Sequence, residues 1–335
     1  MGTPLLELKK INMVFKKRGA LLGQERKFHV LKDVDLEVNS GEIIALVGES
    51  GCGKTTIGKI ITGLLKPTSG EMLFEGKNIS LPFGPDYQNF RNSVQFIQQD
   101  SYAALNPVRT IYQSMCAAVE SVDKKLSVFE KENKVISLLE SVGLTPASLY
   151  LYKYPHQMSG GQRQRVLMAR ALALNPKIIV ADEPVSMIDV SLRISILNLM
   201  LKLNKEKEIS FIYITHDLAT AKYIANEGKI AVMYLGEIVE KAPLSQLLDS
   251  PKHPYTQALI SAVPIPDPKI AKQNFEIPIK NMELMSLENR KEVCSFYDRC
   301  PYANDKCLQK VNYKNIDNVL VKCVLDKTPV WNKKY

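Results

Sequence analysis

The sequence predicts an α/β fold with a parallel sheet at its core, an antiparallel β subdomain, a helical subdomain and a small Cys-rich extension at the C-terminal end. Three observations predict this fold. Short apolar runs separated by stretches of helical period indicate buried parallel strands at residues 42–47, 94–97, 178–181 and 211–214. Two earlier segments, residues 5–14 and 30–38, alternate apolar and polar residues as antiparallel strands do. Four of the six cysteines lie after residue 293.

The length of 335 residues allows two units. We expect the first at residues 1–250, with a helical subdomain at about 101–165, and the second at residues 251–335. Hydrophobic residues make up 45% of the chain and charged residues 24%, as in ordinary globular proteins. No apolar stretch approaches the ~18 residues of a membrane span, and the first ten residues lack a signal-peptide pattern. We therefore expect a cytoplasmic chain that forms no transmembrane path itself.

The net charge of +9 is concentrated at the two ends of the chain. Residues 1–30 hold seven Lys and Arg against two acidic residues, and residues 251–335 hold fourteen against nine, so residues 31–250 carry −1. This distribution does not support a nucleic-acid channel through the core. The basic ends fit a solvated surface or contact with anionic lipid headgroups.

The first eighty residues predict strands and turns around one helix. Residues 16–27 are basic, contain two glycines and are expected to form a loop. Apolar residues at helical spacing predict a helix over residues 56–65, followed by a turn at residues 66–70. Residues 71–74 and 77–79 are expected to pair as a hairpin.

Helical periodicity dominates residues 101–151, for example residues 135–142, which Gly143 closes. The pentapeptide Met158-Ser159-Gly160-Gly161-Gln162 precedes a second strongly helical stretch, residues 163–174. Ser159-Gly160-Gly161 at a helix N-terminus forms a potential anion site.

A glycine-rich run directly after the apolar run 42–47 fits G-x-x-x-x-G-K-[ST], the phosphate-binding P-loop. Lys54 would reach the β and γ phosphate oxygens, and the Thr55 hydroxyl would ligate Mg²⁺. A glycine-rich turn without a ligand is the alternative, which the strand–loop–helix context disfavours. The expected nucleotide-binding residues of this run are Gly48, Glu49, Ser50, Gly51, Cys52, Gly53, Lys54, Thr55 and Thr56.

Polar residues at the ends of three other apolar runs supply the remaining chemistry. Asp182 is the expected Mg²⁺-organising carboxylate, and Glu183 beside it is placed to polarise an attacking water. Gln99 could contact Mg²⁺ or that water, and His216 the γ-phosphate. Each residue alone also fits a structural role. Because the carboxyl ends of parallel strands meet at one edge of a sheet, we expect all four beside the P-loop.

In their order along the chain, these motifs resemble those of the ATP-binding-cassette ATPases. The pentapeptide at residues 158–162 is similar to that family's signature sequence, with Met158 in place of Leu. Residues 186–189 resemble the D-loop, which ends at Asp189, but read Ser-Met-Ile-Asp instead of Ser-Ala-Leu-Asp. Both departures exchange one apolar residue for another.

The resemblance implies a head-to-tail dimer in which Ser159, Gly160, Gly161 and Gln162 bind the γ-phosphate of ATP held by the other subunit. It also implies an aromatic side chain that stacks on adenine upstream of the P-loop. Phe15 and Phe28 are the candidates, and the basic segment between them leaves the choice open.

The C-terminal part is similar to the extension of oligopeptide/dipeptide permease ATPases. The resemblance is carried by His253-Pro254-Tyr255-Thr256 and by the proline-rich residues 263–268. The segment Glu183-Pro184-Val185-Ser186 and the long basic loop further resemble the second of that permease's two ATPase subunits. This implies an ATP-hydrolysing energy-coupling subunit of a peptide importer, peripheral on the cytoplasmic side of the cell membrane.

The implied partners are a paralogous ATPase subunit or a second copy of the chain, two transmembrane permease subunits and, indirectly, an extracytoplasmic substrate-binding protein. Two alternatives remain. An importer of nickel or another small solute would look the same, because other subunits choose the cargo. A soluble cassette ATPase acting on nucleic acid is disfavoured, because such proteins usually carry two cassettes or coiled-coil insertions.

Cys294, Cys300, Cys307 and Cys323 follow a C-x5-C-x6-C-x15-C spacing. Four thiolates hold either zinc or a [4Fe–4S] cluster, and the absence of a tight C-x2–4-C knuckle disfavours zinc. Related peptide-permease ATPases carry an iron–sulfur cluster on this pattern, so we expect the cluster, with zinc or unligated thiols as alternatives. Its expected role is structural, fixing the last ~40 residues.

Overall fold

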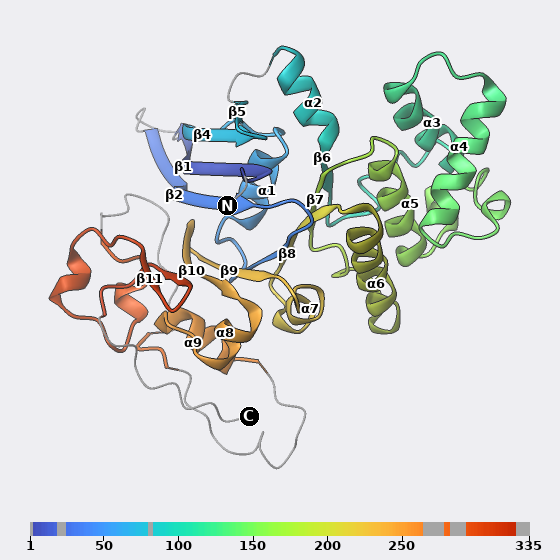
Figure 1. Cartoon of the computed structure of the whole chain (residues 1–335). Coiled ribbons are helices and arrows are strands. Elements are labelled where there is room, and N and C mark those ends of the chain that lie inside the picture. Colours follow the sequence, from blue (N-terminus) through green and yellow to red (C-terminus); the bar gives the residue numbers. More distant parts are fainter. Residues whose placement is uncertain (1–2, 19–24, 80–82, 264–277, 282–292, 326–335) are drawn as a thin grey trace.

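The computed structural model describes residues 3–18, 25–79, 83–263, 278–281 and 293–325 (Figure 1). A large mixed sheet runs through its centre in the strand order β11-β12-β10-β9-β3-β8-β7-β6. The five strands from β9 to β6 are parallel, and β10, β12 and β11 continue the sheet in antiparallel fashion. The strands of the parallel part are β3 (Ile43–Val47), β6 (Val94–Ile97), β7 (Ile178–Asp182), β8 (Ser210–Thr215) and β9 (Lys229–Tyr234).

The predicted apolar runs are confirmed as strands. All residues of β3, β7 and β8 are buried because other elements cover both faces of the sheet, whereas β6, at the sheet edge, has two half-buried residues. Alternate residues of β3 join different core clusters: Ala45 and Val47 face one, Ile44 and Leu46 the other. Helix α1 (Lys54–Ile61) packs on the second face, and α5 (Gly160–Leu172), α6 (Val190–Lys207) and α7 (Leu218–Ile224) pack on the first. The P-loop strand is therefore fixed from both sides.

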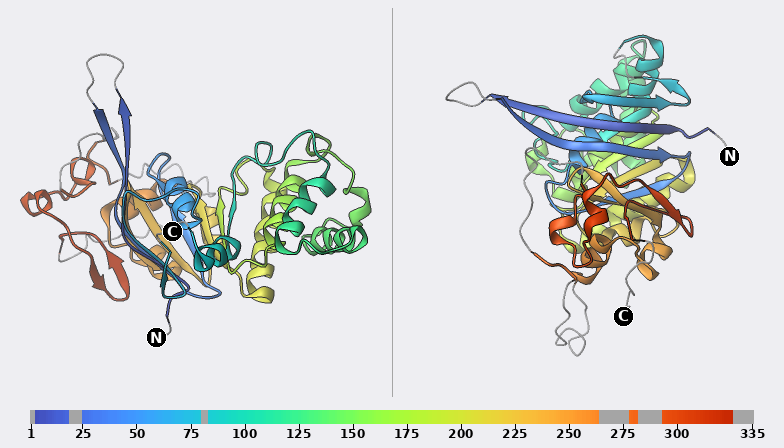
Figure 2. Two further views of the ribbon diagram at one scale, coloured as in Figure 1. Left: turned by 90° about the horizontal axis from the view of Figure 1, so that it is seen from above. Right: turned by 90° about the vertical axis from the view of Figure 1, so that its left-hand side faces the viewer.

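A second, antiparallel sheet has the order β2-β1-β4-β5. It contains β1 (Leu6–Arg18), β2 (Glu25–Val38), β4 (Ser69–Phe74) and β5 (Lys77–Asn78), so the predicted hairpin is confirmed. The loop predicted over residues 16–27 is wrong at both ends. The strands continue through this segment, with Lys16 opposite Lys27 and Lys17 opposite Arg26, and form a long projecting hairpin (Figure 2). Residues 19–24 of that loop lie outside the described residues.

The predicted helical region contains α3 (Ile111–Val122) and α4 (Val128–Ser141) beside the start of α5. All three helices begin with a capping box, built on Thr110, Ser127 and Ser159 respectively. Gly143, at φ +78°, follows α4 as predicted. Figure 1 shows these helices on one side of the molecule, away from the antiparallel sheet. The other α-helices in the described part of the chain are α2 (Pro85–Ser93), α8 (Leu244–Asp249) and α9 (Pro254–Ser261).

Residues 293–325, here called the Cys-rich segment, add two strands to the large sheet. Strand β12 (Val319–Val321) pairs with β10 (Glu237–Pro243), and β11 (Lys314–Ile316) pairs with β12. Phe296 is buried against Tyr234 of β9. Strand pairing and this apolar contact thus anchor the segment, whereas the metal anchor that the cysteine spacing predicts stays a prediction. Within the described residues, no helix has the length and apolar character needed to cross a bilayer.

Candidate active site

The P-loop and the four residues predicted beside it come together at the carboxyl ends of four neighbouring strands. The P-loop follows β3, and His216 follows β8. Asp182 ends β7, Glu183 follows it, and Gln99 lies just beyond β6. Because these strands are parallel and adjacent, their ends form one edge, where α/β sheets bind ligands.

The P-loop is packed against the turn that joins β9 and β10. A side chain at Gly48 would overlap the carbonyl oxygen of Met233, and the N–H of Gly236 donates to the carbonyl of Cys52 over 2.8 Å. Lys54 is buried, and its Nζ donates to the carbonyl oxygens of Gly48 and Glu49, each over 2.8 Å. The P-loop therefore surrounds the Lys54 ammonium group, whose positive charge suits the binding of a triphosphate.

Asp182 is buried at the end of β7 and accepts a hydrogen bond from the side chain of Thr55. Burial raises the pKa of Asp182, and the bond with Thr55 opposes that shift. A hydroxyl and a carboxylate are oxygen ligands of the kind that Mg²⁺ takes, so these two residues fit the expected ion. With the nucleotide, Mg²⁺ would neutralise charge on the β and γ phosphates.

Glu183 binds both of the other predicted catalytic side chains. Its Oε1 lies 2.7 Å from Nδ1 of His216, and its Oε2 accepts a hydrogen bond from Nε2 of Gln99 over 3.0 Å. Its backbone has φ +46°, a left-handed conformation that non-glycine residues adopt mainly at constrained sites. The three residues therefore form one hydrogen-bonded group, which the sequence placed in the same region but could not join.

The signature residues lie apart from the P-loop of the same chain. Ser159 Oγ accepts from the N–H of Gln162, and the Gln162 side chain accepts from the N–H of Ser159, so both serve the cap of α5. Gly160 and Gly161 form the first turn of α5, and Asp189 is the exposed N-cap position of α6. Helix α5 lies toward the helical side of the molecule, away from α1 (Figures 1 and 2).

The two candidates for adenine stacking are cross-strand partners. Phe15 of β1 lies directly opposite Phe28 of β2, and Phe15 is 42% exposed. Directly opposed residues of two antiparallel strands point to the same face. The two rings are therefore neighbours on one face of the hairpin, and the strand register does not show which of them would stack on adenine.

The four C-terminal cysteines are neighbouring thiols. Burial raises the pKa of Cys294 to about 12 and that of Cys300 to about 11, and Cys307 and Cys323 add to both shifts. The N–H of Cys294 donates to the carbonyl of Cys307 over 2.9 Å. Across the residues that the structure describes, however, no three or more His, Cys, Asp or Glu side chains are arranged to hold a metal ion. The four cysteines predicted to hold the [4Fe–4S] cluster are therefore close together, but their side chains are not arranged as metal ligands.

Two residues that contact the P-loop were not among the predicted site residues. The hydroxyl of Tyr255 accepts a hydrogen bond from the N–H of Glu49 over 3.0 Å, and Arg299 forms an ion pair with the Glu49 carboxylate at 3.0 Å. Tyr255 lies in the segment that carried the resemblance to the peptide permeases. That resemblance indicated the family but did not predict a contact with the P-loop. Arg299 gave no signal beyond its place between two cysteines.

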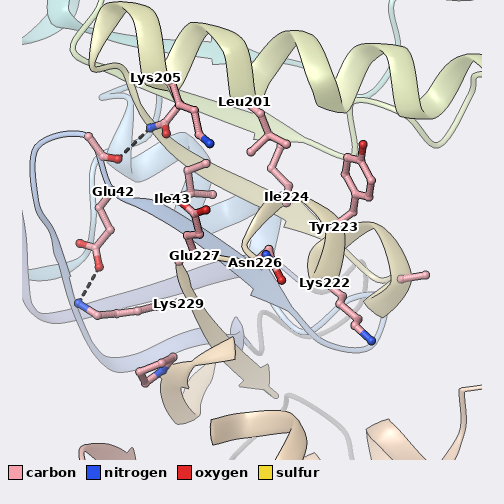
Figure 3. Close-up of a pocket in the computed structure, with 15 residues that line it drawn as sticks. Glu42, Ile43, Leu201, Lys205, Lys222, Tyr223, Ile224, Asn226, Glu227 and Lys229 are labelled. Atoms are coloured by element: carbon pink, nitrogen blue, oxygen red, sulfur yellow. Dashed lines mark hydrogen bonds and ion pairs between the residues drawn. The ribbon is translucent and has the colours of Figure 1, made fainter. Parts of the chain in front are cut away.

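A cavity that none of the predicted site residues lines lies at the other end of β3. It has a volume of about 750 Å³ and is bordered by Ile43, Leu201 and Ile224 together with charged side chains (Figure 3). An ion pair of 2.6 Å between Glu42 and Lys229 closes one side. Because Ile43 begins the strand that Val47 ends, this cavity is separate from the candidate active site.

Comparison with known proteins identifies the family. The family model "ABC transporter" matches residues 31–186, and the model "Oligopeptide/dipeptide transporter, C-terminal region" matches residues 239–307. The dipeptide transport ATP-binding protein DppF of Haemophilus influenzae is 38% identical over 96% of this chain and 97% of its own. The oligopeptide transport ATP-binding protein AppF of Bacillus subtilis is 39% identical over 92% of each chain.

A solved structure supports the same assignment. A dimeric ATP-binding cassette in a post-hydrolysis state with ADP and Pi superimposes with a TM-score of 0.62 at 29% identity, over 71% of this chain and 98% of that one. The chain therefore belongs to the ABC transporter family, as an ATP-hydrolysing subunit of the oligopeptide/dipeptide transport group.

Proposed function

We propose that this chain powers the import of oligopeptides or dipeptides from the cytoplasmic side of the cell membrane. The observation that carries the proposal is the joining of Gln99, Glu183 and His216 into one hydrogen-bonded group beside the P-loop. The match of residues 239–307 to the peptide-transporter C-terminal region supports the cargo class.

In the proposed reaction, Lys54 leaves its contacts with the P-loop carbonyls and stabilises charge on the γ-phosphoryl group. Glu183 orients the attacking water and accepts its proton. Gln99 and His216 hold the Glu183 carboxylate between them, so that its position is set before the substrate arrives. His216, which is 59% exposed, is free to contact the phosphoryl group as well.

We further propose that the site is completed by another subunit. Helix α5 begins at Gly160, where the first N–H groups have no carbonyl partner within the helix, and it packs on the opposite face of the sheet from α1. Placed against the P-loop of a paralogous ATPase or a second copy, it would bind the γ-phosphate there. Asp189, at the start of α6, would lie at the same interface. Two transmembrane permease subunits and an extracytoplasmic substrate-binding protein complete the proposed importer.

The test is to purify the tagged chain from membranes with the subunits that accompany it and to reconstitute them in proteoliposomes. We expect ATP hydrolysis that a peptide-loaded binding protein accelerates, and peptide uptake that depends on ATP. Uptake of nickel or a sugar without peptide uptake would show that the cargo is wrong. Hydrolysis stimulated only by nucleic acid would overturn the transport role.

We also propose that Cys294, Cys300, Cys307 and Cys323 hold a [4Fe–4S] cluster in the mature protein, with zinc as the alternative. Each of the other three thiols raises the pKa of Cys294, which supports the proximity of the four residues, and a bound metal would stabilise their thiolate forms. After anaerobic purification, a broad absorbance near 400 nm with about four irons per chain is expected for the cluster. Stoichiometric zinc, or neither metal, would contradict it.

The domain division is a proposal of the same kind. We place the nucleotide-binding unit at residues 1–250, including the helical subdomain at about 101–165, and the extension at residues 251–335. The helices between Ile111 and Leu172 and the C-terminal family match support these limits. If the division is right, limited proteolysis should release a stable fragment that spans residues 1 to about 250.

A further inference from the structure

Three residues of the Cys-rich segment lie next to a cysteine in sequence and contact the P-loop or the turn that supports it. Arg299 precedes Cys300 and binds Glu49 of the P-loop. Ser295 follows Cys294 and Lys322 precedes Cys323, and both bind Glu237 at the start of β10. Because Gly236, which precedes Glu237, donates to Cys52, both contacts lead to the P-loop.

The contact between Arg299 and Glu49 is the more direct of the two. The Arg299 side chain is 6% exposed, and its Nη1 donates to both Glu49 carboxylate oxygens over 3.1 and 3.0 Å. Nη1 also lies 3.3 Å from the Tyr234 hydroxyl, and Nε donates to the carbonyl of Asn281 over 3.3 Å. The guanidinium is therefore held from three sides, and Glu49 is its acidic partner.

An aromatic cluster fixes the base of this contact. The rings of Tyr234, Tyr255 and Phe296 pack with centroids 4.5–5.5 Å apart, and the Arg299 guanidinium lies near the Tyr234 and Phe296 rings, at 5.6 and 5.9 Å. Tyr255 in turn accepts the Glu49 backbone N–H. Both the backbone and the side chain of Glu49 are thus held by residues outside the cassette's own motifs.

The charge of Glu49 makes this arrangement significant. A carboxylate inside a phosphate-binding loop repels the nucleotide's phosphates, and the repulsion is strong where water is partly excluded. Glu49 is 30% exposed, so solvent alone screens it incompletely. A buried guanidinium bound to that carboxylate cancels the repulsion and holds the loop at the same time.

We propose that Arg299 is a positioning residue for ATP binding, which neutralises Glu49 and fixes the P-loop from the Cys-rich segment. The proposal deepens the ATPase function and rests on it. It gives the Cys-rich segment a part in the nucleotide site: the segment supplies one support of the loop that binds the phosphates.

The experiment measures the affinity of the full-length chain for a fluorescent, non-hydrolysable ATP analogue with Mg²⁺, together with KM and kcat of the complex. Arg299→Ala is expected to weaken analogue binding roughly tenfold or more, equivalent to ~1.4 kcal/mol, and to raise KM more than it lowers kcat. Arg299→Lys, which keeps the charge, should recover part of the loss. The defect should shrink as salt rises, because part of it is unscreened repulsion.

A double-mutant cycle separates this role from a merely structural one. In a Glu49→Gln background the charge that Arg299 neutralises is gone, so Arg299→Ala should have at most about a twofold effect on analogue affinity. Asp317→Asn, which removes the ion pair between Lys252 and the Cys-rich segment, is the matched control and should leave affinity unchanged.

Two results would overturn the proposal: Arg299→Ala that folds and binds the analogue as the wild type does, or an equal loss in both Glu49 backgrounds. A wild-type chain that binds no nucleotide would instead contradict the proposed function. If Arg299→Ala does not fold, Arg299→Lys and Arg299→Gln carry the same comparison across the cycle.

Discussion

At the scale of single residues, Glu183 is the most constrained member of the active site. Its carboxylate is held by His216 over 2.7 Å and by Gln99 over 3.0 Å, on a backbone at φ +46°. A side chain fixed by two partners is suited to orient one water molecule in one place. Because it approaches the substrate through that water, Glu183 should matter for turnover and little for binding.

We predict that Glu183→Gln lowers kcat for ATP by about 10²–10⁴-fold, the usual contribution of a general base. Glutamine keeps the shape and a hydrogen-bonding oxygen but cannot accept the proton, so ATP affinity should change by less than about threefold. Steady-state hydrolysis and nucleotide titration measure the two effects. Hydrolysis near the wild-type rate would show that another group activates the water.

Gly48 is constrained by backbone contact. A Cβ there would overlap the carbonyl oxygen of Met233, a backbone atom that cannot rotate away. We predict that Gly48→Ala displaces the P-loop and weakens ATP binding by at least about tenfold. Gly41→Ala is the control: Gly41 has φ +68° but open space around its Cα, so it tests positive φ without the clash. Similar affinities for the two variants would contradict the argument.

The sequence was sufficient to predict that the P-loop and the polar residues after three other strands lie at one edge of the sheet, because each motif is a short run of neighbours that follows a recognisable apolar run. It could not predict the supports of Glu49, which come from Tyr255 and Arg299, 206 and 250 residues further along the chain. Contacts of such separation leave no local pattern. For the same reason, Gln99, Glu183 and His216 could be placed at one sheet edge but not joined by hydrogen bonds.

At the scale of elements, four of the five parallel strands, β3, β6, β7 and β8, were predicted from the continuous apolar run that burial on both faces leaves. The strand ends at residues 16–18 and 25–27 were missed because they are rich in lysine and arginine and lack an apolar alternation. They form strands by pairing with each other, which the sequence pattern does not reveal. Strands β9 to β12 were not predicted either. Strands β11 and β12 are three residues each, too short for a recognisable sequence pattern. They form because β12 pairs with the edge strand β10.

Helix α1, which opens at the P-loop, sits very close to the sheet at Gly58. A Cβ on Gly58 would lie 2.8 Å from Ile214 Cδ1 and 3.3 Å from atoms of Phe96 and Val180. Alanine gains ~1 kcal/mol in helix propensity over glycine, but overpacking costs about 1–3 kcal/mol. We predict that Gly58→Ala lowers Tm by a few degrees, roughly 2–4 °C per kcal/mol lost.

The second half of this test relieves the overlap. Ile214→Val removes the Cδ1 atom nearest to the new methyl group, so the double variant should lose less than the sum of the two single changes. Thermal unfolding of the four proteins measures this coupling. A Gly58→Ala chain more stable than the wild type would show that the helix moves away from the sheet without cost.

At the scale of the whole molecule, the two predicted anion sites of the chain lie on different helices, one on each face of the large sheet. The P-loop opens α1 beside the antiparallel sheet, whereas Ser159 caps α5 on the helical side (Figure 1). In the proposed dimer, one nucleotide contacts the first site of one subunit and the second site of the other. A substitution at the second site should therefore affect ATP hydrolysis by the assembled complex without affecting ATP binding by a single chain.

We predict that Ser159→Arg leaves the ATP affinity of the isolated chain within about twofold of the wild type, because that affinity comes from the P-loop. Hydrolysis by the assembled complex should fall by at least about 10²-fold, since a large side chain would block the γ-phosphate at the α5 N-terminus. Ser127→Arg is a matched control: Ser127 forms the same kind of capping box on α4, so its loss costs ~1 kcal/mol of stability but should spare hydrolysis. Equal loss of ATP affinity in Ser159→Arg and Lys54→Ala chains would place both sites on one nucleotide within one subunit, against the shared arrangement.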